Sequence, residues 1–105
     1  MTVGYIRSAE ALPSSERQHE LLSRKGCQRF YREDDGMLSA FSQLHAMVDE
    51  IQAADVVVVT ELAVIASSIK ELDTNLSALT DKGIVFMSLA VNAIEKHRAA
   101  ERGAK

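Results

Sequence analysis

Arg7 could hold a phosphate, because it is expected to lie beside the start of a helix. The residues beside it do not form a standard phosphate site. Positions 8–11 read Ser-Ala-Glu-Ala, without a glycine-rich loop ending in Lys-Ser or Lys-Thr and without the three glycines of a dinucleotide fingerprint. A second interpretation is an ion pair between Arg7 and either Glu33 or Glu61.

The side chains that could bind a metal ion or react as a nucleophilic thiol are few. Cys27 is the only cysteine, so it forms no internal disulfide, and its position beside Gly26 favours a small buried thiol. Asp34 and Asp35 could bind a cation, although a solvated turn is the commoner outcome. The three histidines lack the spacing of metal ligands: His19, His45 and His97. We therefore expect neither a metal nor a cofactor.

Length and composition indicate one globular domain. The chain has 105 residues, of which 47% are hydrophobic and 26% are charged. Its formal net charge of −3 argues against autonomous sequence-specific binding to DNA, which usually needs a basic face. The short apolar runs predict no membrane span, and the first residues do not resemble a signal peptide. We expect a cytoplasmic protein without membrane contact.

The hydrophobic pattern alternates between strands and helices. Runs that contain β-forming residues predict strands at 2–8, 27–32, 56–59 and 84–91. Helices are predicted to begin near Ser15, with Gln18 completing a capping box, then at Ser39 and after Leu62. Apolar stripes should face the core from the second and third helices: Leu44, Met47, Val48 and Ile51, then Ile69, Leu72, Leu76 and Leu79.

This order predicts an α/β fold in which helices cover both faces of a mainly parallel four-stranded sheet. Residues 1–105 form a single domain in this interpretation, and 93–105 form a C-terminal helical tail with no DNA-binding domain following. In such folds a functional site lies at the carboxyl ends of the strands. The segments to inspect are 7–10, 32–36, 60–67 and 88–92.

Several strings in this order resemble one known family. From residue 2 to about 95 the chain is similar to the N-terminal catalytic domain of the small serine recombinases, the resolvase/invertase family. The resemblance rests on these strings: Gly4-Tyr5-Ile6-Arg7, Arg17-Gln18, Gly26-Cys27-Gln28-Arg29-Phe30-Tyr31, Asp55-Val56-Val57-Val58-Val59, Glu61-Leu62, and Lys82-Gly83-Ile84-Val85-Phe86-Met87-Ser88-Leu89. The family implies DNA cleavage by a serine that joins covalently to the 5′ end, with arginines holding the developing charge.

The family's catalytic positions are largely replaced in this chain. Of its polar site only Arg7 and Gln18 remain, whereas the nucleophile position holds Ala9. One family glutamine falls on a proline and one arginine on an apolar residue: Pro13 and Phe41. The motif Leu-Asp-Arg-Leu-x-Arg becomes Leu62-Ala63-Val64-Ile65-Ala66-Ser67, so its aspartate and both arginines are lost.

These replacements predict a catalytically inactive domain that acts through protein–protein interaction, either by self-association or by modulating a partner. Phe41, Val64 and Ile65 could form an apolar partner surface, or they could fill the core that the arginines vacated. Two alternatives remain open. Ser8 could act as a displaced nucleophile and retain site-specific strand cleavage, although strand alternation turns it away from Arg7. Arg7 could serve a small anion- or nucleotide-binding domain.

Overall fold

The computed structural model describes residues 1–33 and 41–90 of the chain. The predicted turn at Asp34 and Asp35, the predicted tail at 93–105 and His97 lie outside the described residues. In chain order the elements are β1 (Thr2–Arg7), α1 (Ser15–Arg24), β2 (Arg29–Glu33), α2 (Ser42–Glu50), β3 (Val56–Val59), the short 3-10 helix η1 (Leu62–Val64), α3 (Ile69–Asp81) and β4 (Val85–Ser88).

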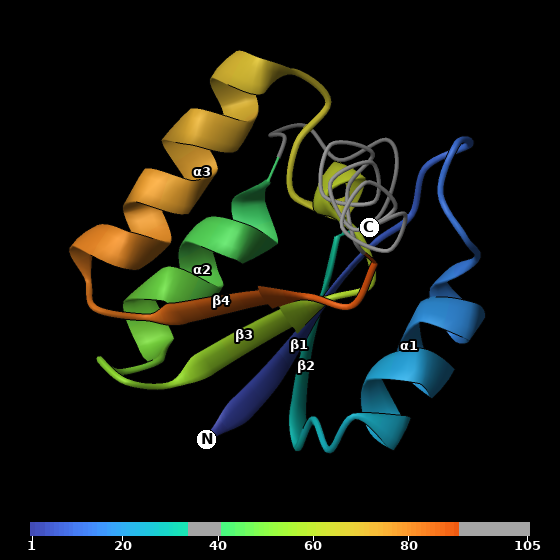
Figure 1. Cartoon of the computed structure of the whole chain (residues 1–105), viewed down its shortest axis with the longest axis horizontal. Coiled ribbons are helices and arrows are strands. Elements are labelled where there is room, and N and C mark those ends of the chain that lie inside the picture. The colour runs from blue at the N-terminus through green and yellow to red at the C-terminus, as the bar shows by residue number, and fades with distance from the viewer. Residues whose placement is uncertain (34–40, 91–105) are drawn as a thin grey trace, which may run out of the picture.

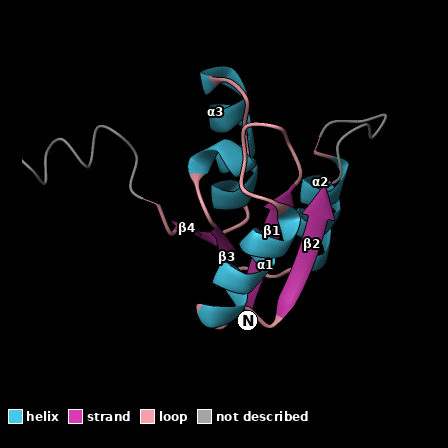
Figure 2. Ribbon diagram, turned by 90° about the vertical axis from the view of Figure 1, so that its right-hand side faces the viewer, coloured by secondary structure: helices cyan, strands magenta, loops and turns pink. Residues whose placement is uncertain are grey.

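The four strands form one parallel sheet in the order β2-β1-β3-β4. Helices lie on both of its faces, with α1 on one side and α2 and α3 on the other (Figures 1 and 2). This confirms the predicted α/β class and the predicted sheet. Each crossover returns the chain to the end of the sheet where the previous strand began. The carboxyl ends of all four strands therefore lie together at the opposite end.

The run of four valines in β3 shows why an unbroken apolar strand fits this fold. Val57 and Val59 are buried with α2 and α3, whereas Val58 is buried on the opposite face with Leu22 of α1. Both faces of a central parallel strand are covered, so no polar residue alternates within it. The larger of the two cores lies under α2 and α3 and includes Met47.

The helix boundaries follow from local chemistry, with one correction. Ser14, and not Ser15, caps α1, because its Oγ accepts a hydrogen bond from the N–H of Arg17 at 3.1 Å. Gly26 follows the end of α1 at φ 96°, and Gly83 follows α3 at φ 81°. Both glycines adopt the left-handed conformation that side chains disfavour, as expected just after a helix.

The predicted apolar stripe of α3 is wrong at its first position. Ile69 is 86% exposed, whereas Leu79 at the other end of the helix is fully buried. Ile69 begins the helix, and this first turn extends past the end of the sheet (Figure 1). In the described ranges, no helix combines the length and the apolar character needed to cross a membrane.

Candidate functional site

The side chain of Arg7 lies at the carboxyl end of β1 and binds the segment that follows β3. Its Nε donates a hydrogen bond to the carbonyl oxygen of Val64 at 2.8 Å, and its Nη2 donates to the carbonyl oxygen of Ala63 at 2.6 Å. A longer contact of 3.5 Å joins Nη2 to Oγ of Ser67. The guanidinium therefore anchors η1 to the sheet, and its donors are directed to protein oxygens.

Phe41 completes the surroundings of Arg7. Its ring centroid lies 5.4 Å from Cζ of the guanidinium, within the range of a cation–π contact. The three positions where the resemblance places arginines are now Phe41, Val64 and Ser67, and all three contact Arg7. The fold thus brings the former arginine positions together around the one arginine that remains.

Gln18 supports the same point from α1 and is fully buried. Its Oε1 accepts a hydrogen bond from the N–H of Arg7 at 3.2 Å, and its Nε2 donates to the carbonyl oxygens of Arg7 and Pro13, each at 2.8 Å. The predicted capping box with Ser15 is therefore wrong, because the amide of Gln18 is engaged with the end of β1. Its role in this structure is positional.

Glu33 is a buried acidic residue that the sequence analysis treated only as a partner for Arg7. Its carboxylate instead accepts hydrogen bonds from Tyr5 Oη at 2.8 Å, from Oγ of Ser42 at 3.0 Å, and from two main-chain N–H groups at the start of α2, those of Gln43 and Leu44 at 2.9 and 3.2 Å. The available signal was an acidic residue at the carboxyl end of a predicted strand, where functional residues are expected.

This carboxylate changes the chemistry of its neighbour. Burial of Tyr5 raises the pKa of its phenol, and the hydrogen bond to Glu33 and the negative charge there raise it further. The phenol therefore stays protonated at neutral pH and acts as a hydrogen-bond donor.

The predicted ion pairs of Arg7 with Glu33 and with Glu61 do not form, because Arg7 donates to the carbonyl groups of Ala63 and Val64.

Ser8 and Ala9 directly follow β1. Ser8 donates its main-chain N–H to the carbonyl oxygen of Glu33 at 2.9 Å, which extends the pairing of β1 with β2 by one residue. Ile6, two positions earlier, is buried on the α1 side of the sheet. Because side chains alternate along a strand, this places Ser8 on the α1 side and Arg7 on the opposite side.

The three apolar residues that were predicted as a possible partner surface fill the core instead. Val64 and Ile65 are fully buried and Phe41 is 7% exposed, all within the core under α2 and α3. Their interpretation as an exposed partner surface is therefore wrong. Phe41 and Val64, which stand where the resemblance places arginines, are thus part of the apolar core.

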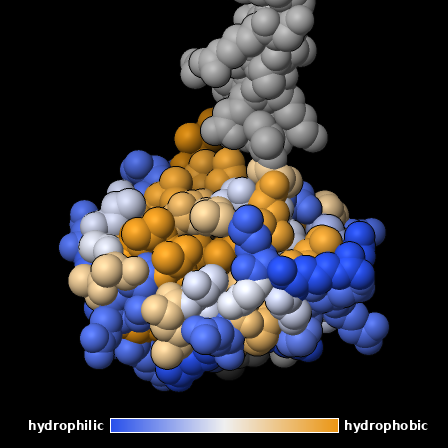
Figure 3. Space-filling model, turned by 60° about the horizontal axis from the view of Figure 1, so that its bottom comes forward, coloured by the Kyte–Doolittle hydropathy of each residue, from blue (hydrophilic) through white to orange (hydrophobic). Residues whose placement is uncertain are grey.

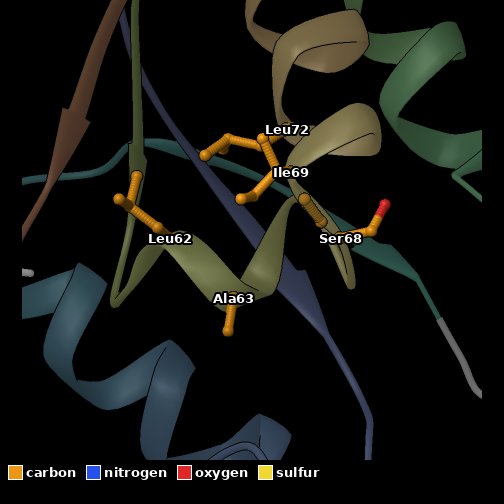
Figure 4. A pocket seen from close by; sticks show the side chains of 6 residues that line it. Leu62, Ala63, Ser68, Ile69 and Leu72 are labelled. Atoms are coloured by element: carbon orange, nitrogen blue, oxygen red, sulfur yellow. The ribbon is translucent and has the colours of Figure 1, made fainter.

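A shallow groove of about 270 Å³ lies on the outer side of the same segment (Figure 4). Its lining is almost wholly apolar and consists of Leu62, Ala63, Ala66, Ser68, Ile69 and Leu72. In Figure 4 the side chains of Leu62, Ile69 and Leu72 border it. One serine hydroxyl is the only polar side-chain group of this lining, so the groove does not suit an anion or a nucleotide.

The remaining reactive side chains stand apart from this site. Burial raises the pKa of the Cys27 thiol, which disfavours the reactive thiolate. His19 packs against the ring of Phe30 at 4.2 Å between centroids, and His45 is exposed on α2. In the part of the chain that the structure describes, no three His, Cys, Asp or Glu residues cluster as a metal site would require.

The fold and the site together define a class: a small α/β domain with a parallel sheet and an arginine at the carboxyl end of its first strand, bonded to main-chain carbonyl groups. The chain belongs to the resolvase family, since the family model for the resolvase N-terminal domain matches residues 2–103. A protein named "Resolvase" from Clostridium perfringens is 34% identical over 92 residues, which is 85% of this chain.

A second "Resolvase", from Clostridium perfringens strain 13 / Type A, is 33% identical over 92 residues. The match covers 49% of each of these relatives, so the chain spans about half their length. The comparison therefore concerns the N-terminal domain that the family model describes.

Proposed function

We propose that this resolvase-family domain does not cleave DNA and acts through protein–protein contacts. The observation that carries the proposal is the state of the site around Arg7. Ala9 stands at the nucleophile position, and the positions of three family arginines hold Phe41, Val64 and Ser67. The remaining guanidinium donates to main-chain carbonyl groups instead of facing an open anion site.

The expected loss of rate supports the absence of DNA cleavage. Removing one preorganised donor to a developing negative charge typically lowers a rate about 10²–10³-fold. Three such donors are replaced here, and their effects need not add. The covalent route also needs a hydroxyl at the position of Ala9, where none exists. A displaced Ser8 would lie on the other side of the strand from Arg7 and would still lack the arginines.

The proposal that the domain acts through protein contacts follows from its two apolar cores. Both apolar cores are intact, and polar positions have been replaced by side chains that extend one of them, such as Val64. A domain that keeps its packing while its polar site is filled can still present surfaces to other proteins. Self-association and binding to an active recombinase are the two forms that we propose.

The test of inactivity is incubation with supercoiled DNA followed by a denaturing gel that detects covalent protein–DNA adducts. An active resolvase-family enzyme on its own site is the positive control. We expect no adduct from this chain, nor from Ala9→Ser, because restoring a hydroxyl does not restore the arginines. An adduct that disappears in Ser8→Ala would contradict the proposal and favour residual recombinase activity.

The interaction part is tested separately. The active enzyme is assayed for cleavage with and without this chain, and the molar mass of this chain alone is measured by light scattering across a dilution series. A changed cleavage rate or a concentration-dependent mass supports the proposal. If the cleavage rate and the mass both stay constant at every concentration, the interaction part is wrong.

A further inference from the structure

The segment that joins β3 to α3 is held in place by side chains from outside it. In its 3-10 turn, the N–H groups of Val64 and Ile65 each donate to the carbonyl oxygen three residues earlier, at 3.1 Å. A 3-10 helix of three residues has weak hydrogen-bond geometry and little stability of its own. The position of this segment must therefore depend on contacts with other elements.

Asn75 of α3 holds the middle of this segment. It is 4% exposed, and its Nδ2 donates a hydrogen bond to the carbonyl oxygen of Ile65 at 2.5 Å. Arg7 at the end of β1 holds the two preceding carbonyl groups, those of Ala63 and Val64. Side chains from two separate elements therefore bind three consecutive carbonyl groups.

Glu71 fastens the end of the same segment to α3. Its Oε1 accepts a hydrogen bond from the N–H of Ser67 at 2.8 Å. Its own N–H donates at 3.1 Å to Oγ of Ser68, which caps α3. We call residues 62–67 the strap, and the three side chains that fasten it are Arg7, Glu71 and Asn75.

The strap covers the larger core at the carboxyl ends of β1 and β3. Val64 and Ile65 are fully buried in that core, whereas Ala63 and Ser67 are exposed. The outer side of the strap borders the groove of Figure 4, and the wider surface of the domain mixes apolar and hydrophilic areas (Figure 3). A movement of the strap away from the sheet would expose two apolar side chains that are fully buried when it is closed.

We propose that the strap opens as one unit while the sheet and the helices stay folded, and that Arg7 and Asn75 set the balance between its closed and open forms. A few side-chain hydrogen bonds and two buried side chains hold the strap, whereas the strands are paired within one sheet. Units that are held by few contacts open at a lower free energy than the whole protein. The strap is thus a conformational device that controls the exposure of Val64 and Ile65. This inference does not depend on whether the domain cleaves DNA or binds another protein.

Native-state hydrogen exchange of the unaltered chain tests the opening itself. The main-chain N–H groups of Val64, Ile65 and Ser67 are compared with those of β3, at urea concentrations below the unfolding transition. We expect the three strap groups to share one opening equilibrium that is at least about tenfold more populated than the opening of β3. Its urea dependence should be smaller, because opening the strap exposes less surface than unfolding. If the three groups exchange only together with β3, by global unfolding, the inference is wrong.

Two substitutions test whether the strap moves as a unit. Asn75→Ala and Arg7→Lys each remove part of the fastening, although neither side chain binds any of the three N–H groups that are measured. Each variant should therefore speed the exchange of all three groups by a common factor of about ten.

The matched control for these substitutions is Thr74→Ala, at an exposed position beside Asn75 on α3. It should leave the three exchange rates within about twofold of the original. A substitution at Asn75 or Arg7 that speeds one of the three groups and not the others would overturn the inference, because the strap would then open piece by piece.

Discussion

Gln18 holds the main chain of Arg7 from both of its polar groups, accepting from its N–H at 3.2 Å and donating to its C=O at 2.8 Å. The same side chain donates to Pro13, so one amide joins the end of β1, the following loop and α1. A residue that the family resemblance marks as part of a polar site is thus fully engaged with the local main chain. Its loss should be felt in stability.

Replacing Gln18 with alanine should lower the free energy of unfolding by about 2–4 kcal/mol. The substitution leaves three partly buried main-chain groups without their hydrogen-bond partner, and each unsatisfied group is costly. Urea unfolding followed by circular dichroism gives the value. Ser23→Ala, at an exposed position on the same helix, should stay within about 0.5 kcal/mol of the original. Equal values for the two variants would contradict the structural role of Gln18.

At Phe41, substitution by glycine should destabilise the protein less than substitution by alanine. It adopts φ 61°, a left-handed conformation that is strained for a bulky residue. Phe41→Ala and Phe41→Gly both lose the buried ring, but the glycine also relieves about 1 kcal/mol of backbone strain. The glycine variant should therefore unfold at the higher urea concentration. The opposite order would mean that this backbone conformation is absent in solution.

Thr60 offers a substitution that should stabilise the protein. Its Oγ1 is buried at the carboxyl end of β3 and has no hydrogen-bond partner among residues 1–33 and 41–90. Thr60→Val keeps the shape and removes the unsatisfied hydroxyl, so the free energy of unfolding should rise by about 1 kcal/mol. The matched comparison is Thr80→Val, because that exposed hydroxyl donates to Ser77 and gains nothing from removal. A loss of stability in the Thr60 variant would show that its hydroxyl is satisfied in solution.

The raised pKa of Tyr5 predicts instability in alkali. Below the ordinary tyrosine pKa of about 10, the phenol of Tyr5 is protonated in both the folded and the unfolded chain. The contribution of the protonated phenol to the free energy of unfolding is then complete. Above about pH 10 the unfolded chain releases the proton first, so the free energy of unfolding should fall as pH rises. Urea unfolding at several alkaline pH values measures the slope. Tyr5→Phe should reduce that slope, and the remaining part should include Tyr31, whose pKa burial also raises.

The architecture was predictable because it depends on patterns that survive in one sequence. The valine run of β3, the glycines after α1 and α3, and the stripe led by Leu44 each follow from burial or backbone geometry. The site was predictable only in part. The resemblance indicates that the positions where the family has arginines lie around Arg7. It does not indicate that Arg7 donates to the carbonyl groups of Ala63 and Val64 instead of pairing with a carboxylate.

Two further features of the site needed three-dimensional contacts. The hydrogen bonds of Glu33 join residues up to 28 positions apart, so no local pattern reports them. The burial of Val64 and Ile65 could be read from the sequence as either surface or core, since an apolar replacement fits both. Packing against α2 and α3 decides the question. The sequence thus marks which residues changed, and the fold decides what the changes do.

The carboxylate of Glu33 also affects whether a phosphate could bind at the start of α2. The first main-chain N–H groups of a helix are the groups with which many proteins hold a phosphate. Here two of them, at Gln43 and Leu44, are already bound to an anion that the protein itself provides. A nucleotide or DNA phosphate arriving at this end of α2 would have to displace a buried carboxylate that also binds Tyr5 and Ser42. The domain thus fills, with a carboxylate of its own, a helix terminus of the kind at which other proteins bind a phosphate.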